Sequence, residues 1–292
     1  MAGEGNPTLR RRELGFLLRQ LRAERGLSIE DVAARALFST TKLSRLETGR
    51  VGASPRDIRD LCLVYEVTDE AERQRLLTLA REGKQRAWWQ QYDLPYATYI
   101  GLEAEAASIS DYNTDVVPEL LQVEGYAHAI LEVAEPPLDP AAIEHRIESG
   151  SKRQALVTRG DSPLLHFIVD EAALRRSLGA PVAMRAQLER IIEVASLPKA
   201  TIQVIPFASG AHPGLGSNFT ILQFNSLMVN DVVYVGGAPG NIYLESSADL
   251  ERYKRVFDRL RSIALDPEDS TAMVKKIAAA AYKDSYNLIE GF

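Results

Sequence analysis

The segment that most constrains the fold is residues 21–50, LRAERGLSIEDVAARALFSTTKLSRLETGR, because helix stop and start signals divide it at short intervals. Gly26 ends a leucine-rich helical pattern, and Ser28 can cap the N-terminus of a second helix. Ser39 can cap a third helix, which Gly49 ends. The segment therefore predicts two short helices joined by a turn of about three residues, the geometry of a helix-turn-helix.

Three further helices are predicted around this segment. Leucines at helical spacing predict an amphipathic helix over residues 8–24. Ser54 followed by Pro55 is typical of a helix start, and a leucine-rich pattern predicts a fifth helix over residues 69–82. Five short helices with brief connections predict an all-α domain over residues 1–84.

The chain changes character after this domain. Residues 85–101 combine Gly and Pro with several aromatic residues, and we interpret them as a connector between domains. Trp88 and Trp89 are expected to pack on neighbouring structure rather than to form a ligand site. Helical patterns return over residues 102–156, and short β-branched and aromatic runs follow beyond Leu164.

These later runs, LLHFIVDE, TIQVIPF, FTILQF, VVYVGG and IYLE, predict strands because Gly, Pro and Asn bound them. A helix is predicted between the first two strands, over residues 183–195, and two more over residues 250–265 and 270–286. The expected fold is an all-α five-helix domain followed by an α+β domain over residues 102–292, with a small mixed or antiparallel sheet.

The net charge of −6 is unevenly divided along the chain. Residues 1–84 contain 16 Lys and Arg against 13 Asp and Glu, so they carry +3. Residues 85–292 contain 18 against 27 and carry −9. Because phosphate binding depends on where cations lie, this division suits a nucleic-acid-binding domain in front of a domain that avoids nucleic acid.

The composition points away from several other classes of protein. The single cysteine, Cys62, lies in an apolar helical pattern and is expected to be a buried hydrophobic residue. The four histidines have no metal-ligand spacing, so neither a metal nor another cofactor is expected. No apolar run reaches the roughly 18–20 residues of a membrane span, and no secretory signal is expected, because no apolar run follows the basic cluster near residue 10. A cytoplasmic location is therefore expected, at the nucleoid when the protein is bound to DNA.

The second helix of the predicted helix-turn-helix carries the candidate base contacts. A helix in the major groove of double-stranded DNA reads base edges with residues near its N-terminal turn. Thr40, Thr41 and Arg45 are predicted to lie on the exposed face of this helix. Threonine methyl groups can contact thymine methyl groups, and Arg45 can form two hydrogen bonds to guanine.

Residues beside this reading face are predicted to contact DNA phosphates. Backbone N–H groups at a helix start can bind a phosphate, and basic or hydroxyl side chains can fix the position on the duplex. The candidates are Ile29, Ser39, Lys42, Ser44, Arg50, Arg11 and Arg12. For Arg11 and Arg12, a solvated helix face is an equally good interpretation.

One carboxylate is predicted to have a structural role instead. Glu47 falls in the last turn of its helix, where the helix dipole disfavours negative charge, so a cationic partner is expected. Arg22 is the predicted partner, in a partly buried ion pair that joins the first and third helices. Replacing Glu47 is therefore expected to lower stability, and DNA binding indirectly.

The motifs RGLSIEDVA and STTKLSRLETGR resemble the XRE (lambda-repressor-like) helix-turn-helix family over about residues 9–82. The later motifs DEAALRRSLG, TIQVIPF, GAHPGLGSNFTIL and YKRVFDRLRSIALDPEDS are similar to a C-terminal domain of unknown function in many regulators from filamentous actinobacteria. The resemblance implies a transcriptional regulator that binds DNA as a homodimer. It also implies links to development and secondary metabolism, and a small partner protein that is often encoded nearby.

The sequence departs from the family pattern at several positions. Ile29 stands where Gln is common, which removes a side-chain phosphate contact and leaves only backbone contacts. Leu37 replaces the usual turn glycine, so a residue poorly suited to positive φ must make the turn. Glu119, Val123 and Gly236 stand where Gly, Thr and Glu are expected, which would alter any ligand or partner site that used them.

The preferred hypothesis is a DNA-binding regulator, dimeric on an inverted-repeat operator, whose second domain receives a ligand or partner-protein signal or forms the dimer. An enzyme is the main competing class, because His166, Asp170, Glu171 and His212 could form an acid/base set. The glycine-rich SGAHPGLGSN lacks a phosphate-binding spacing, however, and acidic residues favour helix starts, so no enzyme is expected. An adaptor that uses the second domain for protein interactions is the other alternative.

Overall fold

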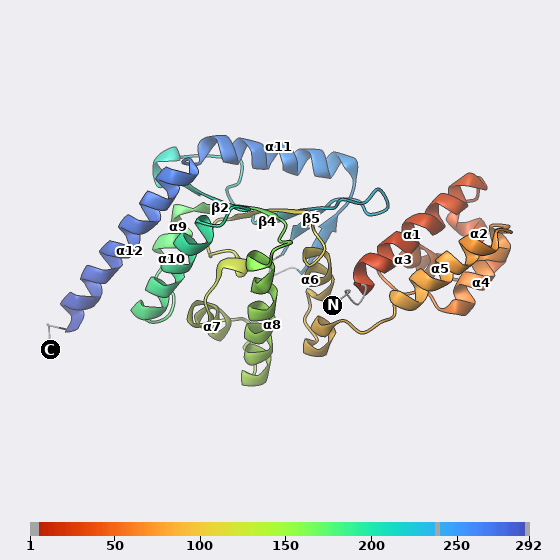
Figure 1. Ribbon diagram of the computed structural model, residues 1–292, viewed down its shortest axis with the longest axis horizontal. Coiled ribbons are helices and arrows are strands. Elements are labelled where there is room, and N and C mark those ends of the chain that lie inside the picture. Colours follow the sequence, from red (N-terminus) through yellow and green to blue (C-terminus); the bar gives the residue numbers. More distant parts are fainter. Residues whose placement is uncertain (1–5, 237–239, 290–292) are drawn as a thin grey trace. The chain divides into compact units, whose positions relative to one another are not determined.

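The structure is a computed structural model that describes residues 6–236 and 240–289, with side chains described up to residue 280. Contacts divide the chain into two units (Figure 1). The first unit contains residues 6–105 and the loop 224–230, and the second contains residues 106–223 and 231–289.

The first unit begins with five short helices, as the sequence predicts. They are α1 (Pro7–Glu24), α2 (Ile29–Ala36), α3 (Thr40–Glu47), α4 (Pro55–Val64) and α5 (Glu70–Glu82). The side chains of Ser28, Ser39, Ser54 and Asp69 each cap the helix that follows by accepting a backbone N–H. Apolar side chains of all five helices meet in one buried core, in which Cys62 is 5% exposed.

The aromatic segment after α5 packs within the first unit. It forms a short 3₁₀ helix, Trp88–Tyr92, and then α6 (Ala97–Glu103). Trp89 and Ile100 are buried in one small apolar cluster, whereas Trp88 is 37% exposed. A Cβ on Gly101 would lie 2.3 Å from the Thr8 hydroxyl, so α6 contacts the start of α1 closely.

This packing places the division between the units after residue 105 rather than at residues 84 and 101, where the sequence suggests it. The physical reason is burial of the aromatic side chains, which ties the segment to the helices before it. A hydrogen bond from Asn6 Nδ2 to the Gly101 carbonyl, at 2.6 Å, fastens both ends of the unit together.

The second unit is built on a six-stranded mixed sheet, which confirms the predicted α+β class. The strands are β1 (Ser108–Asn113), β2 (Leu164–Asp170), β3 (Ala200–Ile205), β4 (Phe219–Gln223), β5 (Val232–Val235) and β6 (Ile242–Leu244). Their order is β3-β2-β1-β4-β5-β6. The first three strands are parallel, and the pairs β1–β4, β4–β5 and β5–β6 are antiparallel.

Strand β1 corrects the sequence analysis, which assigned residues 102–156 to helical patterns. It lies between β2 and β4 in the middle of the sheet. Its sequence, SISDYN, has only Ile109 and Tyr112 as apolar residues, so it lacks the apolar run typical of a buried strand. The buried Asp111 is accommodated by a hydrogen bond from the Thr220 hydroxyl, at 3.1 Å, which no local pattern reveals.

Helices cover both faces of this sheet. They are α7 (Glu124–Glu132), α8 (Pro140–Thr158), α9 (Glu171–Arg175), α10 (Pro181–Ala195), α11 (Ser247–Ile263) and α12 (Pro267–Ile289). Figure 1 shows α11 along one face of the sheet and α7, α8 and α10 on the other. Phe257 and Leu260 of α11 pack on Tyr112, Ile168 and Phe219 in one buried cluster.

The junction between α11 and α12 covers the outer edge of β3. The Ser270 hydroxyl accepts the Val204 N–H at 3.0 Å, and the Leu265 N–H donates to the Val204 carbonyl at 2.9 Å. The Gln203 amide also donates to the Leu265 carbonyl at 2.8 Å. These bonds satisfy backbone groups that an edge strand would otherwise leave open.

Two of the residues that depart from the family pattern have structural partners. The Val123 N–H donates to the Gln187 side chain at 2.8 Å, and the Glu119 carboxylate pairs with the buried Arg153. At Gly236, a Cβ would lie 2.8 Å from the Tyr234 hydroxyl oxygen, so a larger residue would displace that side chain.

A buried histidine gives the second unit a predicted pH dependence. Burial between β2 and α11 lowers the pKa of His166, whose Nε2 lies 2.8 Å from Gln203 Oε1. Because the unfolded chain then binds this proton more readily, the free energy of unfolding should fall as pH drops below about 6.5. Thermal unfolding should show a smaller stability difference between pH 7.5 and 5.5 for His166→Gln than for the unmodified chain. An unchanged difference in His166→Gln would show that this histidine is not the source of the pH dependence.

Candidate nucleic-acid interface

Helix α3 presents a polar face to solvent and an apolar face to the core. Leu43 and Leu46 are 0% and 2% exposed, whereas Thr40, Thr41 and Arg45 are exposed. The helix starts at a capped end, since the Ser39 hydroxyl accepts the Lys42 N–H at 3.1 Å. The three residues that the sequence proposes as base contacts therefore share one accessible helix face.

The turn before α3 contains an exposed leucine in a left-handed conformation. Leu37 has φ 56° and ψ 41° and is 91% exposed, so its side chain gains little from packing. Its N–H donates to the Ala33 carbonyl, which closes α2. The turn that the sequence predicts to be strained is thus made by a non-glycine residue at positive φ.

Leu37→Gly is expected to raise the free energy of unfolding by about 0.5–1 kcal/mol. The left-handed conformation costs a residue with a Cβ about 1–2 kcal/mol, and the greater flexibility of glycine in the unfolded chain offsets part of that gain. Urea unfolding followed by the fluorescence of Trp88 and Trp89 reports on the first unit, which contains both tryptophans. Gly26→Leu, at φ 63° with open space around it, should shift the curve the other way.

The candidate phosphate contacts differ in how accessible their charges are. Arg50 and Ser44 are exposed. Lys42 is already engaged, because its Nζ lies 2.6 Å from Asp57 Oδ1 and 3.8 Å from the centroid of the Phe38 ring. A phosphate at Lys42 would therefore have to compete with a carboxylate.

Arg11 and Arg12 are half-buried on α1. Arg11 donates through Nε to the Pro7 carbonyl at 3.0 Å, and burial lowers the pKa of its guanidinium. A Cβ on Gly49 would lie 2.8 Å from Arg12 Cγ, so the stem of Arg12 packs against the end of α3. Both side chains thus support helix packing, and Arg45 and Arg50 are the more accessible cations.

The start of α2 offers its backbone to a phosphate less freely than the sequence suggests. Ile29 packs its side chain against the core, which leaves only its N–H for such a contact. A capping box places the Asp31 carboxylate at the same helix end, where it accepts the Ser28 N–H at 2.9 Å. Hydrogen bonding from Ser28 lowers the pKa of Asp31, so a negative charge stands beside the proposed phosphate position.

Arg22 and Glu47 form the ion pair that the sequence predicts. Arg22 Nε and Nη2 donate to the two Glu47 carboxylate oxygens at 2.7 and 2.9 Å. The side chains are 17% and 4% exposed. Arg22 Nη1 also donates to the Leu27 carbonyl at 3.0 Å, and hydrogen bonding to Glu47 raises the pKa of Arg22. The pair joins α1 to the end of α3 and so helps to hold the candidate reading helix in place.

The acid/base candidates of the second unit only partly come together. His212 Nε2 lies 3.5 Å from Asp170 Oδ2, and both side chains are largely buried. Glu171 pairs with Arg175 and accepts the Phe207 N–H at 2.8 Å. His166 is engaged elsewhere, with Gln203 and Phe257. Of the four residues that the sequence grouped as a possible acid/base set, the structure thus brings together only Asp170 and His212, although a loop more than 40 residues away supplies the histidine.

The described part of the chain has neither a cluster of metal-binding side chains nor a membrane-spanning helix. Among the side chains described in residues 6–236 and 240–280, His, Cys, Asp and Glu form no group of three that could hold a metal ion. Within the same described ranges, every helix is too short or too polar to span a lipid bilayer.

Two family descriptions match this chain. Residues 13–76 match "Helix-turn-helix domain", and residues 96–276 match "Domain of unknown function (DUF5753)". Among curated proteins, the HTH-type transcriptional regulator DdrOP3 of Deinococcus deserti is 43% identical over 51 residues. That match covers 18% of this chain and 40% of the relative, so the chain spans less than half of the relative's length. No solved structure matches the chain.

The helix-turn-helix match lies within the first unit, whereas the longer match begins in the last ten residues of that unit's main segment and extends through most of the second unit. The helix-turn-helix match includes α3 with its exposed face, together with α2 and α4. The longer match includes all six strands of the sheet. The longer match covers more than half of the residues of this chain. The chain therefore belongs to the DUF5753 family, and it carries a helix-turn-helix domain ahead of the family's own domain.

Proposed function

We propose that the protein is a sequence-specific DNA-binding transcriptional regulator that reads the major groove with α3. The observation that carries this proposal is the accessible face of Thr40, Thr41 and Arg45 on a capped helix. A major groove admits one α-helix, and these side chains suit thymine methyl groups and guanine. The helix-turn-helix match and the name of the curated relative support the same class of function.

The finer features of the proposal concern assembly and signal. We propose that the chain acts in the cytoplasm as a homodimer on an inverted repeat, with half-sites about one helical turn apart. Its second unit receives a ligand or partner-protein signal. The combination of the two domains also supports the proposal of an XRE-type regulator from filamentous actinobacteria that controls development or secondary metabolism.

A selection of binding sites from random DNA, followed by footprinting, tests the proposal directly. We expect enrichment of an inverted repeat and an affinity that falls steeply with salt, because each neutralised phosphate releases counterions. Failure to enrich any sequence would exclude sequence-specific recognition and favour the adaptor hypothesis, in which the helix-turn-helix binds protein.

Arg45→Ala is expected to weaken binding to the selected site by about 10- to 100-fold and to relax base preference at one position. The loss follows from removal of a two-bond contact to guanine, and the exposed position predicts unchanged folding stability. Fluorescence anisotropy at one fixed salt concentration measures the affinity of each variant for the selected site and for the same site with one base pair changed. Arg35→Ala removes the same charge from an exposed position on α2, and it should reduce affinity much less and leave base preference intact. An equal loss in the two variants would show that Arg45 contributes only charge.

We further propose that the second unit acts without catalysis. Asp170 is the N-terminal cap of α9, where its side chain accepts the Ala172 N–H at 2.9 Å, and His212 is 9% exposed. Both features suit a structural contact better than an acid/base pair that must reach a substrate. A turnover that Asp170→Ala and His212→Ala abolish would instead establish an enzyme.

A further inference from the structure

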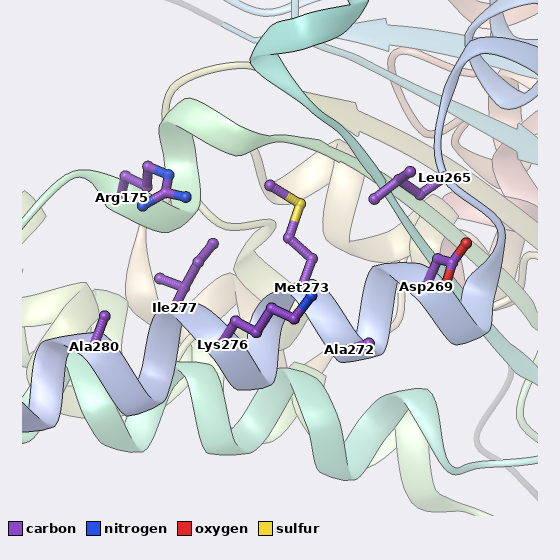
Figure 2. Close-up of a pocket in the computed structure, with 8 residues that line it drawn as sticks. All are labelled: Arg175, Leu265, Asp269, Ala272, Met273, Lys276, Ile277 and Ala280. Carbon is purple, nitrogen blue, oxygen red and sulfur yellow. The ribbon is translucent and has the colours of Figure 1, made fainter.

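A pocket of about 460 Å³ lies beside α12 in the second unit. Its lining comes from α9, from Leu265 in the connection between α11 and α12, and from one side of α12. Figure 2 shows these residues, which are Arg175, Leu265, Asp269, Ala272, Met273, Lys276, Ile277 and Ala280. The volume lies within the roughly 300–1,000 Å³ that is typical of small-molecule pockets.

The pocket exists because α9 is too short to cover α12. On its other side, α12 packs against α10 and β3, where Ser270 and Val274 are each 1% exposed. Helix α9 ends at Arg175 after five residues, so it covers only part of the remaining side. Met273 and Ile277 point into the resulting space and give it an apolar floor (Figure 2).

Two cations, Arg175 of α9 and Lys276 of α12, also belong to the lining. Arg175 uses its Nε to donate to Glu171 Oε1 at 2.6 Å, and a guanidinium has further N–H donors on its two terminal nitrogens. Lys276 is exposed on α12. The one carboxylate of the lining, Asp269, lies near Leu265 at the end of the pocket opposite Arg175 (Figure 2).

We propose that this pocket binds an amphipathic organic anion, a molecule with an apolar body and one carboxylate or similar acidic group. The acidic group would bind Arg175 and Lys276 through charge-assisted hydrogen bonds, which are the stronger class. The apolar body would lie over Ile277 and Met273 toward Leu265. Asp269 favours this orientation, because it repels a negative charge at the far end.

Calorimetric titration of the full chain with decanoate tests the proposal without DNA, so its result does not depend on the proposed DNA recognition. We expect saturable binding of decanoate below the concentration at which it forms micelles. Decanol, which has the same apolar body and no charge, should bind at least about ten-fold more weakly. Equal affinities for the two molecules would overturn the proposal, because they would show that charge plays no part.

Variants locate the binding. Lys276→Gln should weaken decanoate binding by about ten-fold, whereas Lys275→Gln, at an exposed neighbouring position outside the lining, should leave it unchanged. Ala272→Phe should abolish binding of both probes by filling the pocket. Circular dichroism confirms that each variant is folded before titration. Equal losses for the two lysine variants, or full binding by Ala272→Phe, would place the anion elsewhere and contradict the proposal.

Discussion

Glu47→Ala is expected to lower the free energy of unfolding of the first unit by about 3 kcal/mol. The substitution removes the two Glu47 oxygens that accept hydrogen bonds from the Arg22 guanidinium. The Arg22 side chain is 17% exposed, and its bond to the Leu27 carbonyl remains. Loss of one partner from a buried pair costs about 3–5 kcal/mol, and the residual exposure of Arg22 favours the lower end of that range. Urea unfolding followed by tryptophan fluorescence measures the change.

Two further variants separate the ion pair from other effects of the substitution. Glu30→Ala removes an exposed carboxylate from α2 and should change stability by less than about 0.5 kcal/mol. Arg22→Met combined with Glu47→Leu should recover much of the loss, because well-packed apolar residues can replace a buried pair. If Glu47→Ala kept full stability but lost DNA binding, Glu47 would act at the DNA and its structural role would be wrong.

Gly15→Ala is expected to destabilise the first unit by about 1–3 kcal/mol, although alanine is the better helix former. A Cβ at this position would lie 2.6 Å from the Glu47 carbonyl oxygen and 2.7 Å from that of Leu46. These are backbone atoms at the end of α3, so they cannot move aside without shifting the helix. The same tryptophan-monitored unfolding measures the loss.

A second helical glycine provides the opposite case. Gly150 lies inside α8, and a Cβ there would meet nothing within 4 Å. Gly150→Ala should therefore stabilise the chain by up to about 1 kcal/mol, as helix propensity alone predicts. Thermal unfolding followed by circular dichroism detects this change. A stabilising effect at both positions would show that α1 and α3 are not held together closely.

The helix-turn-helix could be predicted from sequence because its signals are local. Ser28, Ser39 and Ser54 act on N–H groups within three residues, and leucine spacing identifies the buried faces. The Arg22–Glu47 pair could also be predicted from sequence, because a carboxylate at a helix C-terminus is unfavourable without a cationic partner. Local chemistry thus determined most of the first unit.

Features that depend on distant contacts could not be predicted in the same way. Strand β1 is central yet polar, and one of the hydrogen bonds that accommodate Asp111 comes from Thr220, 109 residues away. Lys42, which the sequence assigned to a DNA phosphate, forms an ion pair with Asp57. The two residues are 15 positions apart, so no periodic pattern in the sequence indicates the pair. The boundary between the units depends on which helices the aromatic side chains of residues 88–100 pack against, and the sequence alone does not indicate those contacts.

The covered edge of β3 limits how copies of this chain can assemble. An open edge strand is a template for a strand of another molecule, both in ordered oligomers and in aggregates. Ser270 and Leu265 already bond to Val204, so continuous sheet growth is blocked on that side. The opposite edge, β6, contains only three residues. The proposed homodimer would therefore not form by pairing the β3 strands of two copies edge to edge, and the short β6 offers few backbone groups for such pairing.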